Sequence, residues 1–289
     1  MTECRRVPFL TFVVSPYQKV KINLAGCNFD CRGCFAIAKH EVGRELSVED
    51  LIDLLVRSCQ RIFGQIVDDV QMTGGEPTIN TDYLLHLIRE LRKLGVSKIG
   101  LSTNGYLLNR HLVQELKSWG VNYIKLDVKA YSDPIHRWYT GRSNSNVLKA
   151  VQLLSEYGLD FYVRTIYTPG MVEIEEIEKI ARFLGQVNRK ISYKIYQFAP
   201  EHTSNDFLRK SPTPDEMLRA SMIAKSYLDN AEAYTTETVY EPDSSYIEVR
   251  ADELLDEFMR IDEISRAIIK TWEMQYFTMN QILTSSPDS

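Results

Sequence analysis

Residues 19–24 open the regular part of the chain with alternating polar and apolar positions, including the β-branched residues valine and isoleucine. This alternation is typical of a strand. Apolar residues then recur at helical spacing from Leu51 to Ile62, after a capping-box sequence that starts at Ser47 and before Gly64. The pattern therefore predicts a strand followed by an amphipathic helix.

The same order repeats along the chain, because each helical run ends at a glycine and a β-rich run follows. Glycine just past a helix supplies the left-handed residue that ends it. We expect helices over residues 83–94, 111–119, 147–157 and 174–184, and strands over residues 68–73, 97–102, 121–128, 160–167 and 191–198.

Alternating helices and strands imply a parallel sheet with crossover connections. The pattern predicts an α/β fold, a partial (β/α)6 barrel of parallel strands with a C-terminal helical extension. Residues 1–18 are expected to form an N-terminal strap, residues 19–205 the barrel, and residues 206–289 a helix and strand extension packed on the barrel. Chemistry in such a barrel is expected at the C-terminal ends of the strands.

The flanking segments give further expectations. An apolar patch over residues 8–14 predicts a short lead-in strand or strap. Residues 214–229 are expected to form a helix, and residues 233–240 one more strand. The tail from Asp252 to about Leu283 carries an apolar stripe at helical spacing. Such stripes are usually buried, so packing against the barrel is favoured over a partner-binding helix.

Composition and charge exclude some classes of protein. The 289 residues are 44% hydrophobic and carry a net charge of −5, which argues against general nucleic-acid binding. Apolar runs are too short for a membrane span and no signal peptide is visible, so we expect a cytoplasmic protein without membrane contact. The five cysteines are odd in number and three are crowded together, which favours metal over disulfides.

The crowded cysteines are Cys27, Cys31 and Cys34, in a CxxxCxxC pattern directly after the first expected strand. Three thiolates without a fourth nearby suit a cubane iron–sulfur cluster with one iron left open for another ligand. The spacing alone also permits a zinc module with His40 as the fourth ligand. Cys59 lies on the apolar face of a helical run, where a small buried residue is the favoured interpretation.

A second motif, Gly74-Gly75-Glu76, follows the second expected strand. Two glycines let the backbone approach a ligand closely, because neither has a side chain. Glu76 offers a carboxylate or a backbone acceptor for an amine. Alone, the motif is a weak indication of a ligand site. The cysteine motif after the preceding strand makes that indication stronger.

Together these motifs resemble those of the radical S-adenosylmethionine (SAM) superfamily. The resemblance implies that the three cysteines hold a [4Fe–4S] cluster, that SAM chelates its open iron, and that Gly74, Gly75 and Glu76 meet the amino group of SAM. One electron then cleaves SAM, and the 5′-deoxyadenosyl radical takes a hydrogen atom from the substrate. The cofactors supply the difficult chemistry, and the protein positions and shields it.

Further motifs over about residues 19–200 are similar to those of glycyl-radical activating enzymes of the pyruvate formate-lyase type. The resemblance implies that Thr103, Asn104 and Asp127 lie near the carboxylate and ribose of SAM or a nearby cation. It also implies that Lys129 lies near the substrate, that Arg164 and Ile166 lie along SAM, and that His202 belongs to the active site. Asp127 and Arg164 could alternatively form a structural ion pair, and His136 is equally open between a catalytic and a structural role.

Two positions depart from the family pattern. Gly33 stands where an aromatic residue usually packs near the adenine, and Phe35 is the candidate to compensate for it. Ser102 stands where the pyruvate formate-lyase activator has an aspartate for its cation. The cation site is therefore an open question.

The resemblance also implies partners and leaves the substrate open. A low-potential electron donor, flavodoxin or ferredoxin, is expected, together with a glycyl-radical enzyme or another substrate protein. The alternatives are an RNA, a small molecule or cofactor precursor as substrate, and, in another class, a non-catalytic zinc-binding module.

Overall fold

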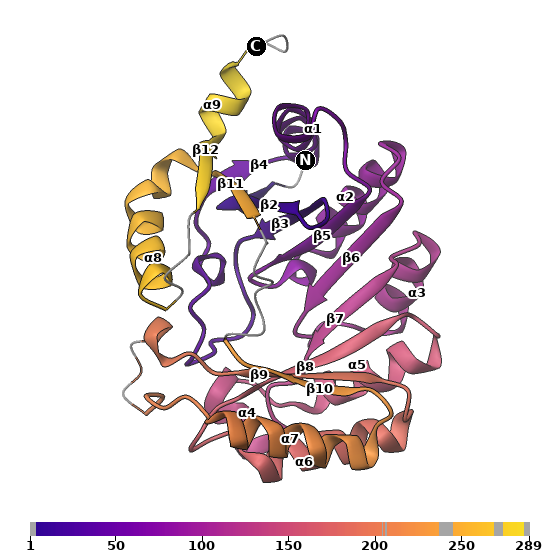
Figure 1. The fold of residues 1–289 in the computed structure, drawn as a ribbon. Coiled ribbons are helices and arrows are strands. Elements are labelled where there is room, and N and C mark those ends of the chain that lie inside the picture. Colours follow the sequence, from indigo (N-terminus) through magenta and orange to yellow (C-terminus); the bar gives the residue numbers. More distant parts are fainter. Residues whose placement is uncertain (1–3, 204, 206, 237–244, 269–273, 286–289) are drawn as a thin grey trace.

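The computed structural model describes residues 4–203, 205, 207–236, 245–268 and 274–285 (Figure 1). Its main feature is one curved sheet of ten strands within these residues. In spatial order the strands are β10 (Ala231–Tyr234), β9 (Ser192–Gln197), β8 (Phe161–Tyr167), β7 (Tyr123–Asp127), β6 (Lys98–Thr103), β5 (Asp69–Gly74), β3 (Lys19–Leu24), β2 (Phe9–Ser15), β11 (Ser245–Arg250) and β12 (Gln275–Thr278).

Strands β3, β5, β6, β7, β8 and β9 lie side by side in this order and pair in parallel. The connecting helices cover the convex face of the sheet (Figure 1). They are α1 (Val48–Phe63), α2 (Thr81–Lys93), α3 (Arg110–Ser118), α5 (Ser145–Glu156) and α6 (Ile174–Val187). The prediction of an α/β partial barrel of parallel strands is therefore confirmed. Helix α4 (Asp133–Thr140) was not predicted.

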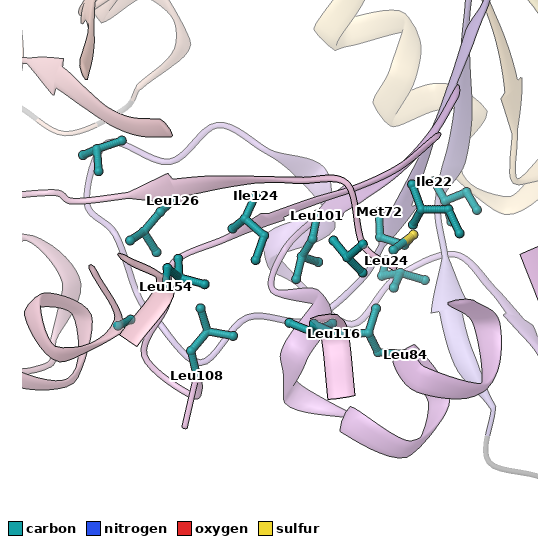
Figure 2. Close-up of a cluster of buried hydrophobic side chains, with 14 of the residues drawn as sticks. Ile22, Leu24, Met72, Leu84, Leu101, Leu108, Leu116, Ile124, Leu126 and Leu154 are labelled. Carbon is teal, nitrogen blue, oxygen red and sulfur yellow. The ribbon is translucent and has the colours of Figure 1, made fainter. Parts of the chain in front are cut away.

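The core lies between the convex face and these helices (Figure 2). Ile22, Met72, Leu101, Ile124 and Leu126 point from successive strands toward helix residues in a fully buried layer. Because side chains alternate along a strand, the residues between them lie on the opposite, concave face. These are polar, and include Lys21, Gln71, Ser102 and Lys125.

The flanking segments extend this sheet at both ends. The lead-in strand β2 pairs antiparallel with β3, and β11 pairs antiparallel with β2. Helix α7 (Pro214–Tyr227) follows the predicted range closely, and its partner β10 pairs in parallel with β9. The predicted strand over residues 233–240 is described only to residue 236, and residues 237–240 lie outside the described residues.

The tail differs from the expected continuous stripe. It comprises α8 (Leu255–Ile268), β12 and α9 (Met279–Thr284), so a strand separates two helices. β12 pairs with β11, which the alternation pattern did not predict. A separate two-stranded sheet joins β1 (Arg5–Val7) to β4 (Arg44–Leu46). Within the described ranges, no helix has both the length and the apolar character needed to cross a membrane.

Candidate active site

The cysteine motif lies on the loop that leaves the C-terminal end of β3. Cys31 is buried, Cys27 is half-buried and Cys34 is exposed. The backbone N–H of Asp30 donates to the carbonyl of Thr140 at 2.9 Å, and that of Arg32 donates to the carbonyl at position 139 at 3.0 Å. The end of helix α4 therefore holds the loop in place.

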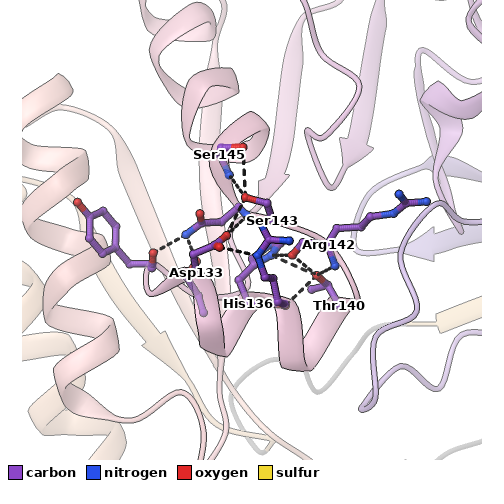
Figure 3. A network of polar contacts seen from close by, with 10 residues as sticks. Asp133, His136, Thr140, Arg142, Ser143 and Ser145 are labelled. Carbon is purple, nitrogen blue, oxygen red and sulfur yellow. Dashed lines mark hydrogen bonds and ion pairs between the residues drawn. The ribbon is translucent and has the colours of Figure 1, made fainter.

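A polar network fixes this end of α4 (Figure 3). The His136 ring nitrogen Nδ1 lies 2.7 Å from the carbonyl oxygen of Arg142, and the Thr140 hydroxyl donates to the carbonyl of His136 at 2.8 Å. The Asp133 carboxylate accepts the Ser143 hydroxyl at 2.7 Å. Burial lowers the pKa of His136, which favours the neutral ring. These contacts give His136 a structural role behind the cysteine loop.

Gly33, the departure inside the motif, has neighbours that leave little room for a side chain. A Cβ atom there would lie 2.9 Å from the Tyr139 hydroxyl and 3.1 Å from the ring of Phe198. Two aromatic side chains from other elements therefore occupy the space beside this backbone position. Phe35, the expected substitute, is 58% exposed in the structure.

Gly74 and Gly75 bring the end of β5 against the cysteine loop. A Cβ on Gly75 would lie 2.1 Å from the carbonyl oxygen of Gly26, and Gly74 has a left-handed φ of +115°. The backbone N–H of Glu76 donates to that same Gly26 carbonyl at 2.8 Å. The glycines therefore allow backbone to meet backbone beside the cysteines.

The Glu76 carboxylate is fully buried and accepts hydrogen bonds from three residues. Thr78 donates through its backbone at 3.0 Å and its hydroxyl at 2.7 Å, and Thr103 donates through its hydroxyl at 2.7 Å. The backbone N–H of Asn104 donates to the second oxygen at 2.6 Å. Burial raises the pKa of Glu76, although each of the four hydrogen bonds acts to lower it. The backbone of Glu76 is engaged as well, because its N–H donates to Gly26 and its carbonyl oxygen lies 3.4 Å from the guanidinium of Arg5.

Asn104 connects this centre to the cysteines. Its side-chain amide donates to Asn28 Oδ1 at 2.7 Å and lies 3.9 Å from the sulfur of Cys27. The buried Nδ2 of Asn28 has no partner in the described structure. An unpartnered buried donor favours a ligand that accepts from it. Sequence reasoning missed Asn28, although its position between two cysteines of the motif was a signal.

Arg5 is a second residue that the sequence did not indicate. This buried guanidinium donates to the carbonyl of Pro77 at 2.9 Å and to the carbonyl of Ala25. It therefore joins the segment after Glu76 to the end of β3.

Asp127 forms a half-buried ion-pair centre at the ends of β7 and β8. Its carboxylate lies 2.8 Å from Arg164 and 3.1 Å from Lys129. Burial alone would raise the pKa of Asp127, but the two cations outweigh it and hold the pKa below its ordinary value. Asp127 in turn raises the pKa of Lys129 against the effect of burial. The structure thus contains the ion pair between Asp127 and Arg164 that the sequence left as an alternative. The pair lies at the C-terminal ends of the strands, where chemistry is expected.

The cysteine thiols are affected by burial and by Lys129. Burial raises the pKa of Cys31 to about 12 and also raises the pKa of Cys27. The nearby Lys129 cation opposes both shifts. Metal ligation needs the thiolate, so Lys129 favours the charge state in which these residues bind a cluster.

A polar cavity of about 400 Å³ lies on the outer side of the cysteine loop. Its lining includes Cys31, Cys34, His40, Lys39 and Arg137. In the ranges that the structure describes, no three His, Cys, Asp or Glu side chains are grouped closely enough to hold a metal ion. This holds for the three cysteines alone as well as for a zinc site completed by His40, so the geometry does not choose between the two cofactors.

Two expected site residues remain. Ile166 is half-buried on β8 and packs against the core, beside Tyr196 in the register of β9. His202 ends the short 3-10 helix η3 (Pro200–His202), and its side chain lies outside the described residues. The structure brings together Cys27, Glu76, Thr103 and Asn104 as one group, and Asp127, Lys129 and Arg164 as another.

Comparison with known proteins identifies relatives. A family model described as the radical SAM superfamily matches residues 24–184. A Methanocaldococcus jannaschii protein with the provisional name glycyl-radical enzyme activating enzyme is 31% identical over 221 residues, which span 75% of this chain and 81% of the relative. A second protein of that organism, with the same provisional name, is 27% identical and matches 76% of this chain and 90% of its own length.

A solved structure supports the fold alone. Streptococcus suis SuiB bound to its precursor peptide SuiA superimposes with a TM-score of 0.59 at 15% identity, over 88% of this chain and 55% of SuiB.

Proposed function

The chain belongs to the radical SAM superfamily, and from that premise we propose that it abstracts a hydrogen atom from a glycine of a partner protein. The enzymes of this family use a [4Fe–4S] cluster and SAM. The glycine substrate is supported by the names of the two M. jannaschii relatives, which match most of this chain. The observation that carries the proposal is the cysteine loop joined to the Gly-Gly-Glu segment at one end of the sheet.

The residues present fit these cofactors. Cys27, Cys31 and Cys34 are the three thiol ligands of the cluster, and no fourth cysteine lies on their loop. The orphaned Nδ2 of buried Asn28 offers a donor beside Cys27. Gly75 has no side chain, which lets this segment pack directly on the backbone of Gly26 beside the cysteine loop. When bound, the cluster and SAM together supply a radical that abstracts hydrogen.

The protein's own residues position and shield this chemistry. Glu76 holds the ends of β5 and β6 together through Thr103 and Asn104, and so fixes Asn104 against Cys27. Lys129 and Arg164 share the carboxylate of Asp127, so three charged groups have fixed positions at the mouth of the barrel. In the proposal, Lys129 faces the substrate, Arg164 and Ile166 line the SAM site with Phe35, and His202 completes the active site.

A low-potential electron donor, flavodoxin or ferredoxin, is part of the proposal, as is a cytoplasmic location. The cavity beside Cys34 is lined by Lys39 and Arg137 and also by Asp30, which pairs with Lys39 at 2.5 Å. Arg137 pairs in turn with Asp133 at 2.6 Å.

Electron paramagnetic resonance tests the glycine substrate. The reduced, SAM-loaded enzyme is incubated anaerobically with a glycyl-radical enzyme encoded beside it, and with a variant of that partner whose radical-bearing glycine is alanine. The proposal predicts a glycyl-radical doublet with the natural partner and none with the variant. Release of 5′-deoxyadenosine without any protein radical would reject the glycine substrate while leaving the superfamily chemistry intact.

A further inference from the structure

The concave face of the sheet carries positive charge on strands that lie apart in sequence. Lys21 on β3, Lys125 on β7 and Lys194 on β9 lie on this face, since neighbours such as Ile22 and Ile124 are buried on the helix side. We call these three half-buried residues the lysine cluster.

The acids nearest to this face are engaged with other cations. Asp69 lies 3.3 Å from Lys19 and 2.9 Å from Lys98, and Asp127 pairs with Arg164 and a lysine on its own strand end. Among the described residues, no carboxylate lies within ion-pair distance of the lysine cluster. Its ammonium groups therefore form no direct ion pair with a carboxylate of the described residues.

Two further acids lie near this face without forming an ion pair with the lysine cluster. Glu248 on β11 interacts electrostatically with Lys21, but its carboxylate accepts a hydrogen bond from Arg250 at 2.7 Å. Glu232 lies opposite Lys194 in the register of β9 and β10, but its carboxylate accepts the hydroxyl of Tyr234.

Tyrosine rings hold the lysine cluster together. The ammonium of Lys194 lies 4.9 Å from the ring centre of Tyr162, and that of Lys125 lies 5.9 Å from the same ring. Lys125 also lies 5.7 Å from the ring of Tyr123. A cation is attracted to the face of an aromatic ring, but the ring carries no net charge that could neutralise it.

The pKa shifts of Lys125 and Lys21 agree with this arrangement of charges. Burial and the neighbouring cations Lys19, Arg164 and Lys21 lower the pKa of Lys125 to about 6, although Asp69 acts in the opposite direction. Burial, Lys19 and Arg164 lower the pKa of Lys21 to about 8. An anion at this position would relieve the repulsion that causes part of both shifts.

We propose that the lysine cluster binds carboxylates of the substrate, so that the glycine-bearing segment entering the barrel is acidic. This rests on the proposed function, because it names the chemistry of the substrate of the same site. A carboxylate on the concave face would gain one or more charged hydrogen bonds in a partly dry environment.

Titration calorimetry on the SAM-loaded, cluster-containing enzyme tests this proposal. The probes are a five-residue peptide with a central glycine flanked by glutamates, its matched glutamine peptide, and tricarballylate as a small free polycarboxylate. The variants are Lys125→Gln and, as control, Lys225→Gln, an exposed lysine on the outer helix α7. Loading with SAM ensures that the carboxylate of SAM is already in place.

We expect the acidic peptide to bind at least tenfold more tightly than the glutamine peptide, and Lys125→Gln to remove that difference while Lys225→Gln keeps it. Binding of tricarballylate alone, weakened by Lys125→Gln, would support the lysine cluster but assign it to a free acid. Equal affinity for both peptides, no binding of any probe, or a loss of SAM affinity alone in Lys125→Gln would overturn the proposal. Release of 5′-deoxyadenosine by the same wild-type sample, measured without peptide, reports separately on the superfamily chemistry.

Discussion

Glu76 is a buried carboxylate whose hydrogen bonds join the ends of β5 and β6. The sequence indicated this residue as a ligand contact for an amine. In the structure its side chain accepts hydrogen bonds from Thr103 and from the backbone of Asn104, whose side-chain amide lies 3.9 Å from the sulfur of Cys27. The side chain of Glu76 therefore fixes the loop after β6. The spacing of the motif in the sequence does not reveal this contact.

Glu76→Gln tests this role. A glutamine keeps one oxygen but turns an amide N–H₂ toward the backbone N–H of Asn104, which then loses its acceptor. We expect the free energy of unfolding to fall by about 2 kcal/mol, because hydrogen bonds to charged groups contribute about 1.5–3 kcal/mol. Urea unfolding measures it, with exposed Glu263→Gln on α8 as a control that changes stability by less than about 0.5 kcal/mol. Equal stability of both variants would contradict the role.

The glycines at positions 75 and 33 provide a matched pair. An alanine Cβ at Gly75 would lie 2.1 Å from a backbone oxygen, whereas one at Gly33 would meet the tip of the Tyr139 side chain at 2.9 Å. Side-chain tips can move, so Gly33→Ala should cost about 1 kcal/mol and Gly75→Ala about 3 kcal/mol or more. Chemical denaturation measures both costs, and the reverse order would contradict the close backbone approach.

At the scale of elements, the parallel strands and outer helices could be predicted because their hydrophobic periods are regular. Strand β6, for example, begins at Lys98, one residue from the expected start. Helix α4 was missed because helix α5, and not a strand, follows its closing Gly141, so it falls outside the repeated order of helix, glycine and strand. β11 and β12 were missed because their stability comes from pairing with β2 and with each other, and partners distant in sequence leave no local signal.

Arg250 connects β11 to α8 and β12. Its buried guanidinium makes two hydrogen bonds of 2.8 Å to Asp262 and one of 2.7 Å to Glu248, and it lies 4.7 Å from the ring centre of Tyr276. These contacts make Arg250 the main polar connection between the tail and the sheet.

Arg250→Met leaves two acids without their cation. We expect it to reduce the free energy of unfolding by about 3–5 kcal/mol at pH 7. Burial already raises the pKa of Glu248, and removing the cation raises it further. An acid with a raised folded-state pKa destabilises the fold while ionised, so the deficit should shrink as the pH falls from 7 toward 4.

Urea unfolding at several pH values checks this prediction. Exposed Arg260→Met on α8 is the control and should change stability by less than about 0.5 kcal/mol. A deficit that stays constant with pH would argue against ionised Glu248 and Asp262 as its cause.

At the scale of the whole molecule, the chain forms one extended sheet whose concave face lies opposite the packed helices (Figure 1). Of the candidate site, the sequence could indicate the cysteines and the strand-end residues, because motif spacing and strand order place them on one edge. It could not indicate Arg5 or the lysine cluster, whose surroundings arise only when distant strands meet. The sequence shows that polar residues alternate along each strand. It does not show which strands bring their polar residues close together on the concave face.

The central claim is that Cys27, Cys31 and Cys34 hold a cluster that reacts with SAM. The most direct test is 5′-deoxyadenosine release after anaerobic reconstitution and reduction, in the wild type, in Cys31→Ala and in Cys59→Ala, a buried cysteine on α1 away from the loop. The account predicts release and the iron and sulfide of one [4Fe–4S] cluster in the wild type and in Cys59→Ala, and neither in Cys31→Ala. Unchanged release from Cys31→Ala, or a colourless wild-type protein that holds zinc, would contradict it.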